Sequence, residues 1–201
     1  MFPLGNVLFP SVLLPLHVFE PRYRALVKDC LDGDQEFGVV LIERGSEVGG
    51  GDVRSDVGCV ARMVEAVEVD DGRWAVGALG TRRVRVLDWL PDDPYPRAEV
   101  EDWEDEGPGG DVLADRYDTT VAVLRRVLAL SAELGLGAAP VTTELADDPI
   151  LGSYQAAALA PMGPLDQQRA LAAPGPLARL ELVAGWLDEE ATVLSQRLDM
   201  E

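Results

Sequence analysis

The most constraining feature of the sequence is a change in its hydrophobic pattern at residues 104–111, Glu-Asp-Glu-Gly-Pro-Gly-Gly-Asp. Ahead of this acidic stretch, apolar residues occur in short runs that are typical of strands. Beyond it they recur every three or four residues, which is typical of amphipathic helices. A chain of 201 residues is long enough for two such parts. The sequence therefore predicts a β-rich first domain over residues 1–106 and a helical second domain over residues 107–201.

The first part contains several candidate strands and one candidate helix. Proline, glycine and Asp-Gly turn signals bound the candidate strands, which cover residues 4–9, 12–18, 37–42, 57–69, 74–79, 84–90 and 98–103. A helix is predicted to begin at Pro21, because proline fits the first turn and apolar side chains follow at helical spacing from Tyr23 to Leu31. The pattern predicts a unit of six to eight strands that also contains this helix.

The second part is predicted to form helices over residues 112–134, 149–159, 165–172 and 177–198. In the last of these, apolar residues alternate in steps of three and four, at Leu177, Leu180, Ala184, Leu187, Ala191, Leu194 and Leu198. The stripe has two interpretations. It packs on the other helices of the same chain, or it forms the seam of a homodimer or of a complex with another protein.

The chain carries a formal net charge of −19, most of it in the second half. Residues 1–87 have a net charge of −3 and residues 88–201 a net charge of −16. Such a field repels phosphate groups, so nucleic acid and anionic membranes are not expected as partners. Arg82, Arg83 and Arg85 form a basic cluster, which we expect to pair with the protein's own carboxylates or to contact an acidic peptide or small anion.

Residues that usually perform catalysis or hold cofactors are scarce. Lys28 is the single lysine, His17 is the single histidine, and the two cysteines are Cys30 and Cys59. This set completes neither a phosphate-binding P-loop nor a usual zinc site, and both cysteines are interpreted as small buried hydrophobes. The sequence therefore predicts no catalytic residue, no cofactor and no metal. An enzyme of unrecognised type would have to use His17 and surface carboxylates.

No apolar run in the sequence approaches the roughly 20 residues that a bilayer requires. The apolar opening stretch lacks a positively charged segment and is interrupted by Pro3, Pro10 and Pro15, so a signal peptide is not expected. We expect a cytoplasmic protein.

Several segments, taken in order, resemble a known family. The opening reads Phe2-Pro3-Leu4-Gly5-Asn6-Val7-Leu8-Phe9-Pro10, followed by Leu14-Pro15-Leu16-His17-Val18-Phe19-Glu20-Pro21-Arg22-Tyr23-Arg24. Later segments are residues 37–42, 57–61 and 80–86, then Pro94-Tyr95-Pro96, Asp166-Gln167-Gln168 and Leu177-Ala178-Arg179-Leu180. Together they make nearly the whole chain similar to the substrate-binding N-terminal domain of Lon protease, in its stand-alone bacterial form.

The resemblance implies an α+β fold, with a PUA-like β-barrel followed by an α-helical bundle. It also implies a non-catalytic module that binds unfolded or degron-bearing polypeptides and selects them for proteolysis by a separate protease. The ATPase and the Ser–Lys peptidase of the full-length protease have no matching positions in this sequence, so no enzyme activity is expected. The alternative function is an interaction or scaffold protein that binds a folded partner or itself through its C-terminal helix.

A receptor for unfolded chains needs an accessible apolar groove, or an edge strand that pairs with an extended peptide. The candidate segments are the proline-containing strand over residues 13–18, residues 19–23 and the glycine-rich loop at 49–51. The alternative for Phe19 and Tyr23 is that both are core residues. The predicted polypeptide-binding residues are Leu14, Leu16, Phe19, Glu20, Arg22, Tyr23 and Arg83.

Overall fold

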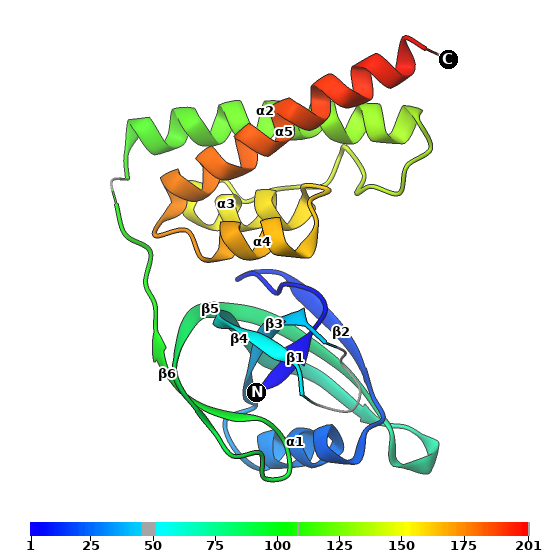
Figure 1. Cartoon of the computed structure of the whole chain (residues 1–201), viewed down its shortest axis with the longest axis vertical. Helices are drawn as coiled ribbons and strands as arrows, with labels where there is room; N and C mark the ends of the chain where they lie inside the picture. Colours follow the sequence, from blue (N-terminus) through cyan, green and yellow to red (C-terminus); the bar gives the residue numbers. More distant parts are fainter. Residues whose placement is uncertain (46–50, 108, 201) are drawn as a thin grey trace. The chain divides into compact units, whose positions relative to one another are not determined.

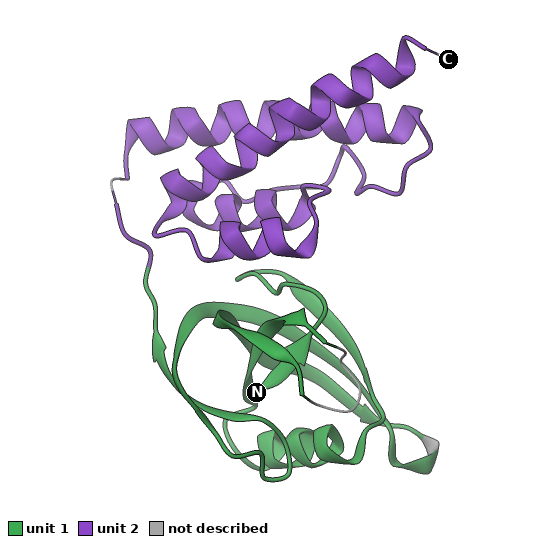
Figure 2. Ribbon diagram, in the orientation of Figure 1, with its two compact units in different colours: residues 1–104 green, residues 105–201 purple. Residues whose placement is uncertain are grey.

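The structure is a computed structural model of the chain, and it describes residues 1–45, 51–107 and 109–200. It divides into two compact units, residues 1–104 and 105–201 (Figure 2). Strands β1 to β6 and helix α1 belong to the first unit, and helices α2 to α5 belong to the second (Figure 1). The chain is therefore a mixed α+β protein. Residues 49 and 50 of the predicted binding loop lie outside the described residues.

The six strands form one sheet in the order β1-β3-β4-β5-β2, with β6 paired to β5. β1 runs parallel to β3, and the other pairs are antiparallel. The path ends in β1 and β2, and no described pairing joins these two strands, so the sheet is open. The closed barrel implied by the resemblance is not confirmed. The strands are β1 (Phe2–Leu4), β2 (Leu13–Val18), β3 (Glu36–Arg44), β4 (Val53–Glu68), β5 (Trp74–Leu90) and β6 (Arg97–Asp102).

β5 is a single long strand, although the sequence analysis predicted two strands separated at Gly80 and Thr81. β2 pairs with residues 74–79 of β5, and β6 pairs with residues 84–90. Between them, the N–H of Gly80 donates to the carbonyl of Val12 at 2.9 Å. A Cβ atom at Gly80 would collide with the carbonyl of Phe9, so glycine permits a close approach here and does not end the strand.

The predicted strand over residues 4–9 is wrong. β1 covers Phe2–Leu4, and residues 5–9 form no strand. Leu8 and Phe9 are nevertheless buried, with 3% and 1% of their surface exposed. Because burial alone is enough to select apolar side chains, an apolar run of this length does not distinguish a buried loop from a strand.

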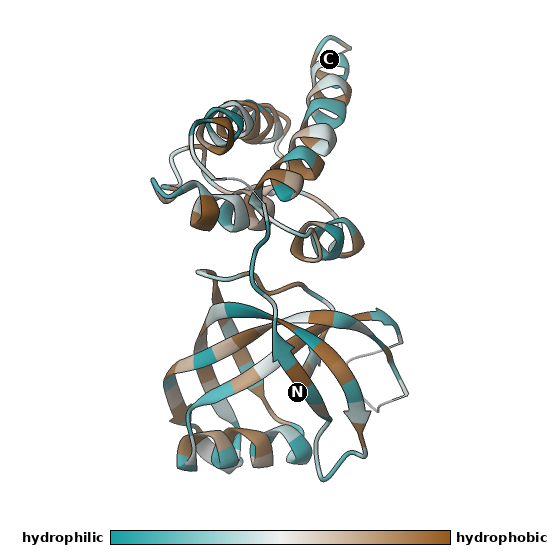
Figure 3. Cartoon of the chain, turned by 90° about the vertical axis from the view of Figure 1, so that its left-hand side faces the viewer, coloured by the Kyte–Doolittle hydropathy of each residue, from teal (hydrophilic) through white to brown (hydrophobic). Residues whose placement is uncertain are grey.

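Helix α1 (Pro21–Asp32) begins at the predicted proline and covers the core of the first unit. Its buried Tyr23 stacks on Phe2, with the two ring centroids 4.1 Å apart. Hydrophobic and hydrophilic residues alternate along much of the sheet, as expected for strands with one buried face (Figure 3). Cys59 is fully buried and free, which confirms its interpretation as a small hydrophobe; Cys30 is free and half-buried. Burial raises the pKa of Cys59 to about 12 and that of Cys30 to about 11.

The second unit consists of helices that pack on one another. α5 packs mainly on α2, and also contacts α3 and α4. None of the described helices is both long and apolar enough to cross a membrane. The helices are α2 (Asp111–Glu133), α3 (Pro149–Leu159), α4 (Pro164–Leu171) and α5 (Pro176–Leu198).

The apolar stripe of α5 faces the interior of the second unit. Its central members are at most 5% exposed, namely Leu180, Ala184, Leu187, Ala191 and Leu194. The interpretation as intramolecular packing is therefore confirmed. A stripe that is already buried offers no surface to a partner helix.

The division between the units falls two residues earlier than the sequence analysis placed it. Asp105 and Glu106 are held by the helical unit: the N–H of Glu106 donates to the carbonyl of Pro174 at 2.8 Å, and Asp105 pairs with Arg179 at 2.7 Å. Local sequence showed only an acidic stretch at this point, and these contacts join positions far apart in the chain.

Arg179, the residue that pairs with Asp105, lies on α5 and is completely buried. Its guanidinium group donates to Asp105, to the Oγ atom of Ser153 at 2.7 Å and to the carbonyl of Ala170 at 3.2 Å. It also lies 3.6 Å from the ring centroid of Tyr154, whose hydroxyl donates to Asp105 at 2.9 Å. Every nitrogen of the buried cation thus has an acceptor, which the interior of a protein demands.

Candidate functional site

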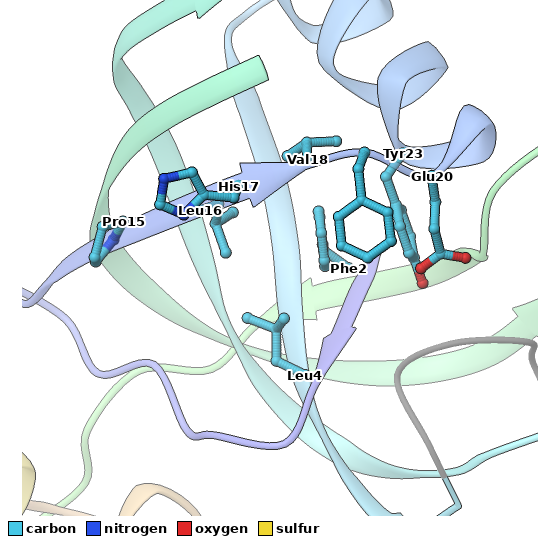
Figure 4. Close-up of a pocket in the computed structure, with 9 residues that line it drawn as sticks. Phe2, Leu4, Pro15, Leu16, His17, Val18, Glu20 and Tyr23 are labelled. Carbon is cyan, nitrogen blue, oxygen red and sulfur yellow. The ribbon is translucent and has the colours of Figure 1, made fainter. Parts of the chain in front are cut away.

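A pocket of about 170 Å³ lies between the two end strands of the sheet, β1 and β2 (Figure 4). In the close-up, Phe2 and Leu4 come from β1, and Leu16 and His17 come from β2. We call this space the seam pocket, because it occupies the place where the sheet fails to close. Its lining is apolar or aromatic apart from His17 and Glu20, and consists of Phe2, Leu4, Pro15, Leu16, His17, Val18, Phe19, Glu20 and Tyr23.

Phe19 follows β2 directly and is 56% exposed, which is unusual for a large aromatic side chain. It lines the seam pocket and also a second pocket of about 210 Å³, which it shares with Val69, Arg73 and Trp74. Val69 is itself 41% exposed. Phe19 therefore belongs to an accessible apolar surface with a hollow on each side.

Tyr23 forms part of the floor of the seam pocket and is only 4% exposed. Burial raises its pKa to about 12, so the phenol is neutral at ordinary pH. The guanidinium of Arg22 lies 4.5 Å from its ring centroid, and the same group pairs with Glu20 at 3.1 Å. The lining thus includes a buried aromatic ring and a carboxylate, Glu20, and both contact the guanidinium of Arg22 at the start of α1.

The structure brings most of the predicted binding residues to this region. Leu14 is half-buried and packs on the core next to the pocket-lining stretch of β2, while Arg22 is not part of the lining and pairs with Glu20, which is. The alternative that both aromatic residues are core holds for Tyr23 and fails for Phe19. The predicted residues that line the seam pocket are Leu16, Phe19, Glu20 and Tyr23.

Arg83 does not line either pocket beside Phe19. It is 2% exposed, lies 4.5 Å from the ring centroid of Trp103 and donates to the carbonyl of Glu104 at 3.2 Å. Arg85 contacts the same ring at 4.2 Å, as expected if the two arginines share a face of β5. Trp103 therefore covers part of the basic cluster, and Arg83 is a structural residue of the first unit.

Sequence reasoning missed the contribution of β1 and of the first residue of β5. Phe2 and Leu4 supply one wall of the seam pocket, and Trp74 supplies part of the second pocket. The apolar character of these positions was visible. Their position beside β2 was not, because it depends on the order of strands in the sheet.

The seam offers apolar surface and the backbone of an edge strand. Among the described residues, no three His, Cys, Asp or Glu side chains are grouped to hold a metal ion. The arrangement is suited to contact with apolar side chains of another molecule.

Comparison with curated proteins gives relatives along almost the entire chain. The Lon protease of Anaeromyxobacter dehalogenans is 30% identical over 206 residues, which covers 99% of this chain and 24% of that protein. A Schizosaccharomyces pombe protein named for a LON peptidase N-terminal domain and a RING finger is 24% identical over 221 residues, covering 92% of this chain and 44% of that protein. The chain thus spans about a quarter of the length of the Lon protease it matches.

Two solved structures have the same fold. The Lon N-terminal domain protein from Xanthomonas campestris superposes with a TM-score of 0.68 at 28% identity, covering 92% of this chain and 95% of that one. The N-terminal domain of the Mycobacterium avium complex Lon protease gives a TM-score of 0.66 at 14% identity and covers 92% and 96% of the two chains. The model of the ATP-dependent protease La (LON) substrate-binding domain matches residues 1–189, and the chain therefore belongs to this family.

Proposed function

We propose that this chain binds polypeptides at the seam pocket and the surface around Phe19, and that binding involves no catalytic step by these residues. The observation that carries the proposal is the 56% exposure of Phe19 between two largely apolar hollows. Unfolded chains expose apolar side chains that folded proteins bury, so an accessible apolar surface distinguishes the two. Membership of a substrate-binding domain family supports the same function.

The ligands we propose are unfolded or degron-bearing polypeptides, which the protein would deliver to a separate protease in the cytoplasm. Burial of one large side chain contributes roughly 1.5–3 kcal/mol, so a surface of this size supports binding in the micromolar range at best. The net charge of the first unit restricts the polypeptides that it can bind. Residues 1–104 hold 11 Lys and Arg against 20 Asp and Glu, a net charge of −9, which disfavours acidic segments.

The proposal is tested by fluorescence anisotropy of a labelled, permanently unfolded polypeptide titrated with the protein. We expect saturable binding that the unlabelled unfolded polypeptide displaces and its folded form does not. An anisotropy that stays flat up to high micromolar protein would contradict the proposal.

A further inference from the structure

β2 is an edge strand whose outer side faces the seam pocket. In the described part of the chain its single ladder partner is β5. Four consecutive residues of β2, from Pro15 to Val18, line the pocket. Consecutive side chains of a strand point to opposite faces, so a hollow lined by all four lies along the edge of the strand.

The direction of the backbone groups on this edge follows from one hydrogen bond. The carbonyl of Val12 accepts from the N–H of Gly80 and so points toward β5. In a trans peptide the next N–H points the opposite way, so the N–H of Leu13 points outward, and the direction alternates from there. The backbone N–H and carbonyl groups of Leu13 and His17, and the backbone carbonyl of Pro15, therefore face the open edge.

Pro15 agrees with this assignment. Proline has no N–H, and within sheets it is tolerated where that group would face away from the neighbouring strand. The open edge thus presents carbonyls at Leu13, Pro15 and His17, with N–H groups at the first and last of them. Carbonyl and N–H groups in this spacing match the backbone of another extended chain.

We propose that the polypeptide is bound as an added β-strand along the open edge of β2, an inference that rests on the proposed function and specifies how the ligand is held. A segment of about six residues matches the length of β2. Backbone pairing would supply affinity independent of sequence, and every second side chain would lie on the face of Leu16 and Val18.

Charge selects the occupant of the edge. A second copy of this chain also presents an open β2, but each copy carries a net charge of −19, and like charges oppose edge-to-edge pairing. The ligand that fits is a different polypeptide segment, with apolar residues at alternate positions and with lysine or arginine at its ends.

The test uses labelled ten-residue peptides with alternating apolar and polar residues between terminal lysines. Two further peptides carry backbone N-methyl groups, one at the apolar positions and one at the polar positions. Strand addition predicts that one methylated peptide binds at least about tenfold more weakly, because it loses its hydrogen bonds to β2, while the other stays within about threefold of the parent. Loss at the polar positions indicates an antiparallel strand, and loss at the apolar positions indicates a parallel one.

A pair of protein variants tests independently whether the outward N–H of His17 contributes to peptide binding. His17→Pro removes the outward N–H, and His17→Ala removes the side chain but keeps that N–H. We expect His17→Pro to bind the parent peptide at least about fivefold more weakly than His17→Ala, with thermal unfolding used to verify that both variants are folded.

The outcomes separate the two proposals. If the parent peptide binds and both methylated peptides bind equally well, or are weakened equally, strand addition is contradicted while apolar binding at the seam stands. If neither the parent peptide nor an unfolded polypeptide binds, both proposals fail. A dimer of the protein that dissociates when peptide is added would assign the edge to a second copy and overturn the inference.

Discussion

The two units of the chain differ in how far they bury their apolar residues. In the helical unit, the apolar stripe of α5 is buried against the other helices, and Leu187 is completely buried. In the β-rich unit, the sheet ends at β1 and β2, and Phe19 beside that opening is 56% exposed. A helix inside a group of helices has neighbours on its apolar face, whereas an end strand has a neighbour on one side only. The regular apolar stripe of α5 therefore stabilises the fold, and the less regular segment around β2 and Phe19 is the candidate for binding.

The largest effect expected in the helical unit is that of Arg179. Arg179→Ala leaves Asp105 and Ser153 without their buried partner, and removal of one member of a buried pair costs about 3–5 kcal/mol. We expect a lower free energy of unfolding of that size by urea titration followed by circular dichroism. Arg169→Ala is the matched control, because its pair with Asp166 is exposed and contributes less than about 1 kcal/mol. Equal stability of the two variants would show that the buried pair does not hold this unit together.

A second pair of variants tests whether the α5 stripe is core or interface. Leu187→Ala should lower the free energy of unfolding by about 2–5 kcal/mol, because it creates a cavity in the core. Leu182→Ala, at a position of the same helix that is 49% exposed, should change it by less than about 1 kcal/mol. Sedimentation should show no change in oligomeric state for Leu187→Ala. A stable, folded variant that loses a dimer would instead make the stripe an interface.

The smallest effect concerns the surface of the β-rich unit, where Glu36 pairs with Arg62 and Arg82 at 2.7 Å each. Burial opposes the charge of Glu36, but hydrogen bonds from the two arginines outweigh it and hold its pKa below the ordinary value of 4.5. The stabilisation is therefore present above pH 4.5 and is lost as the pH falls through the lowered pKa. Screening by solvent limits it to about 1 kcal/mol or less.

Glu36→Gln should accordingly be slightly less stable than the parent chain at pH 7, and the difference should shrink as the pH falls below 4.5. Urea titrations at several pH values measure it. Glu65→Gln, at an exposed position of β4, is the control. A difference that grows on acidification would contradict the assigned direction of the pKa shift.

Much of the fold was predictable from local sequence. Pro21 marked the start of α1, and the spacing of apolar residues marked α5, because helix signals are local. The strand predicted over residues 4–9 and the break predicted at Gly80 were wrong for a common reason. Apolar runs and glycines report burial and close approach, and neither reports which strands pair.

The candidate site was predictable in part. The segment from Leu16 to Tyr23 was identified, since its aromatic residues and prolines are visible in sequence. Arg83 was not distinguishable from a surface arginine, because its burial depends on Trp103, 20 positions away in the chain. One local feature of the sequence could have predicted that Arg179 is buried. Arg179 stands four residues before the buried Val183 and so shares the inner face of α5.

The most direct test of the account compares Phe19→Ser with Leu165→Ser, two substitutions at positions that are each 56% exposed. Anisotropy titrations of a labelled unfolded polypeptide should show at least about tenfold weaker binding for Phe19→Ser, because an apolar contact of roughly 1.5–3 kcal/mol is lost. Leu165→Ser, in the helical unit, should bind within about twofold of the parent chain, and both variants should keep its thermal stability. Equal affinities of the two variants for the polypeptide would contradict the assignment of binding to the seam.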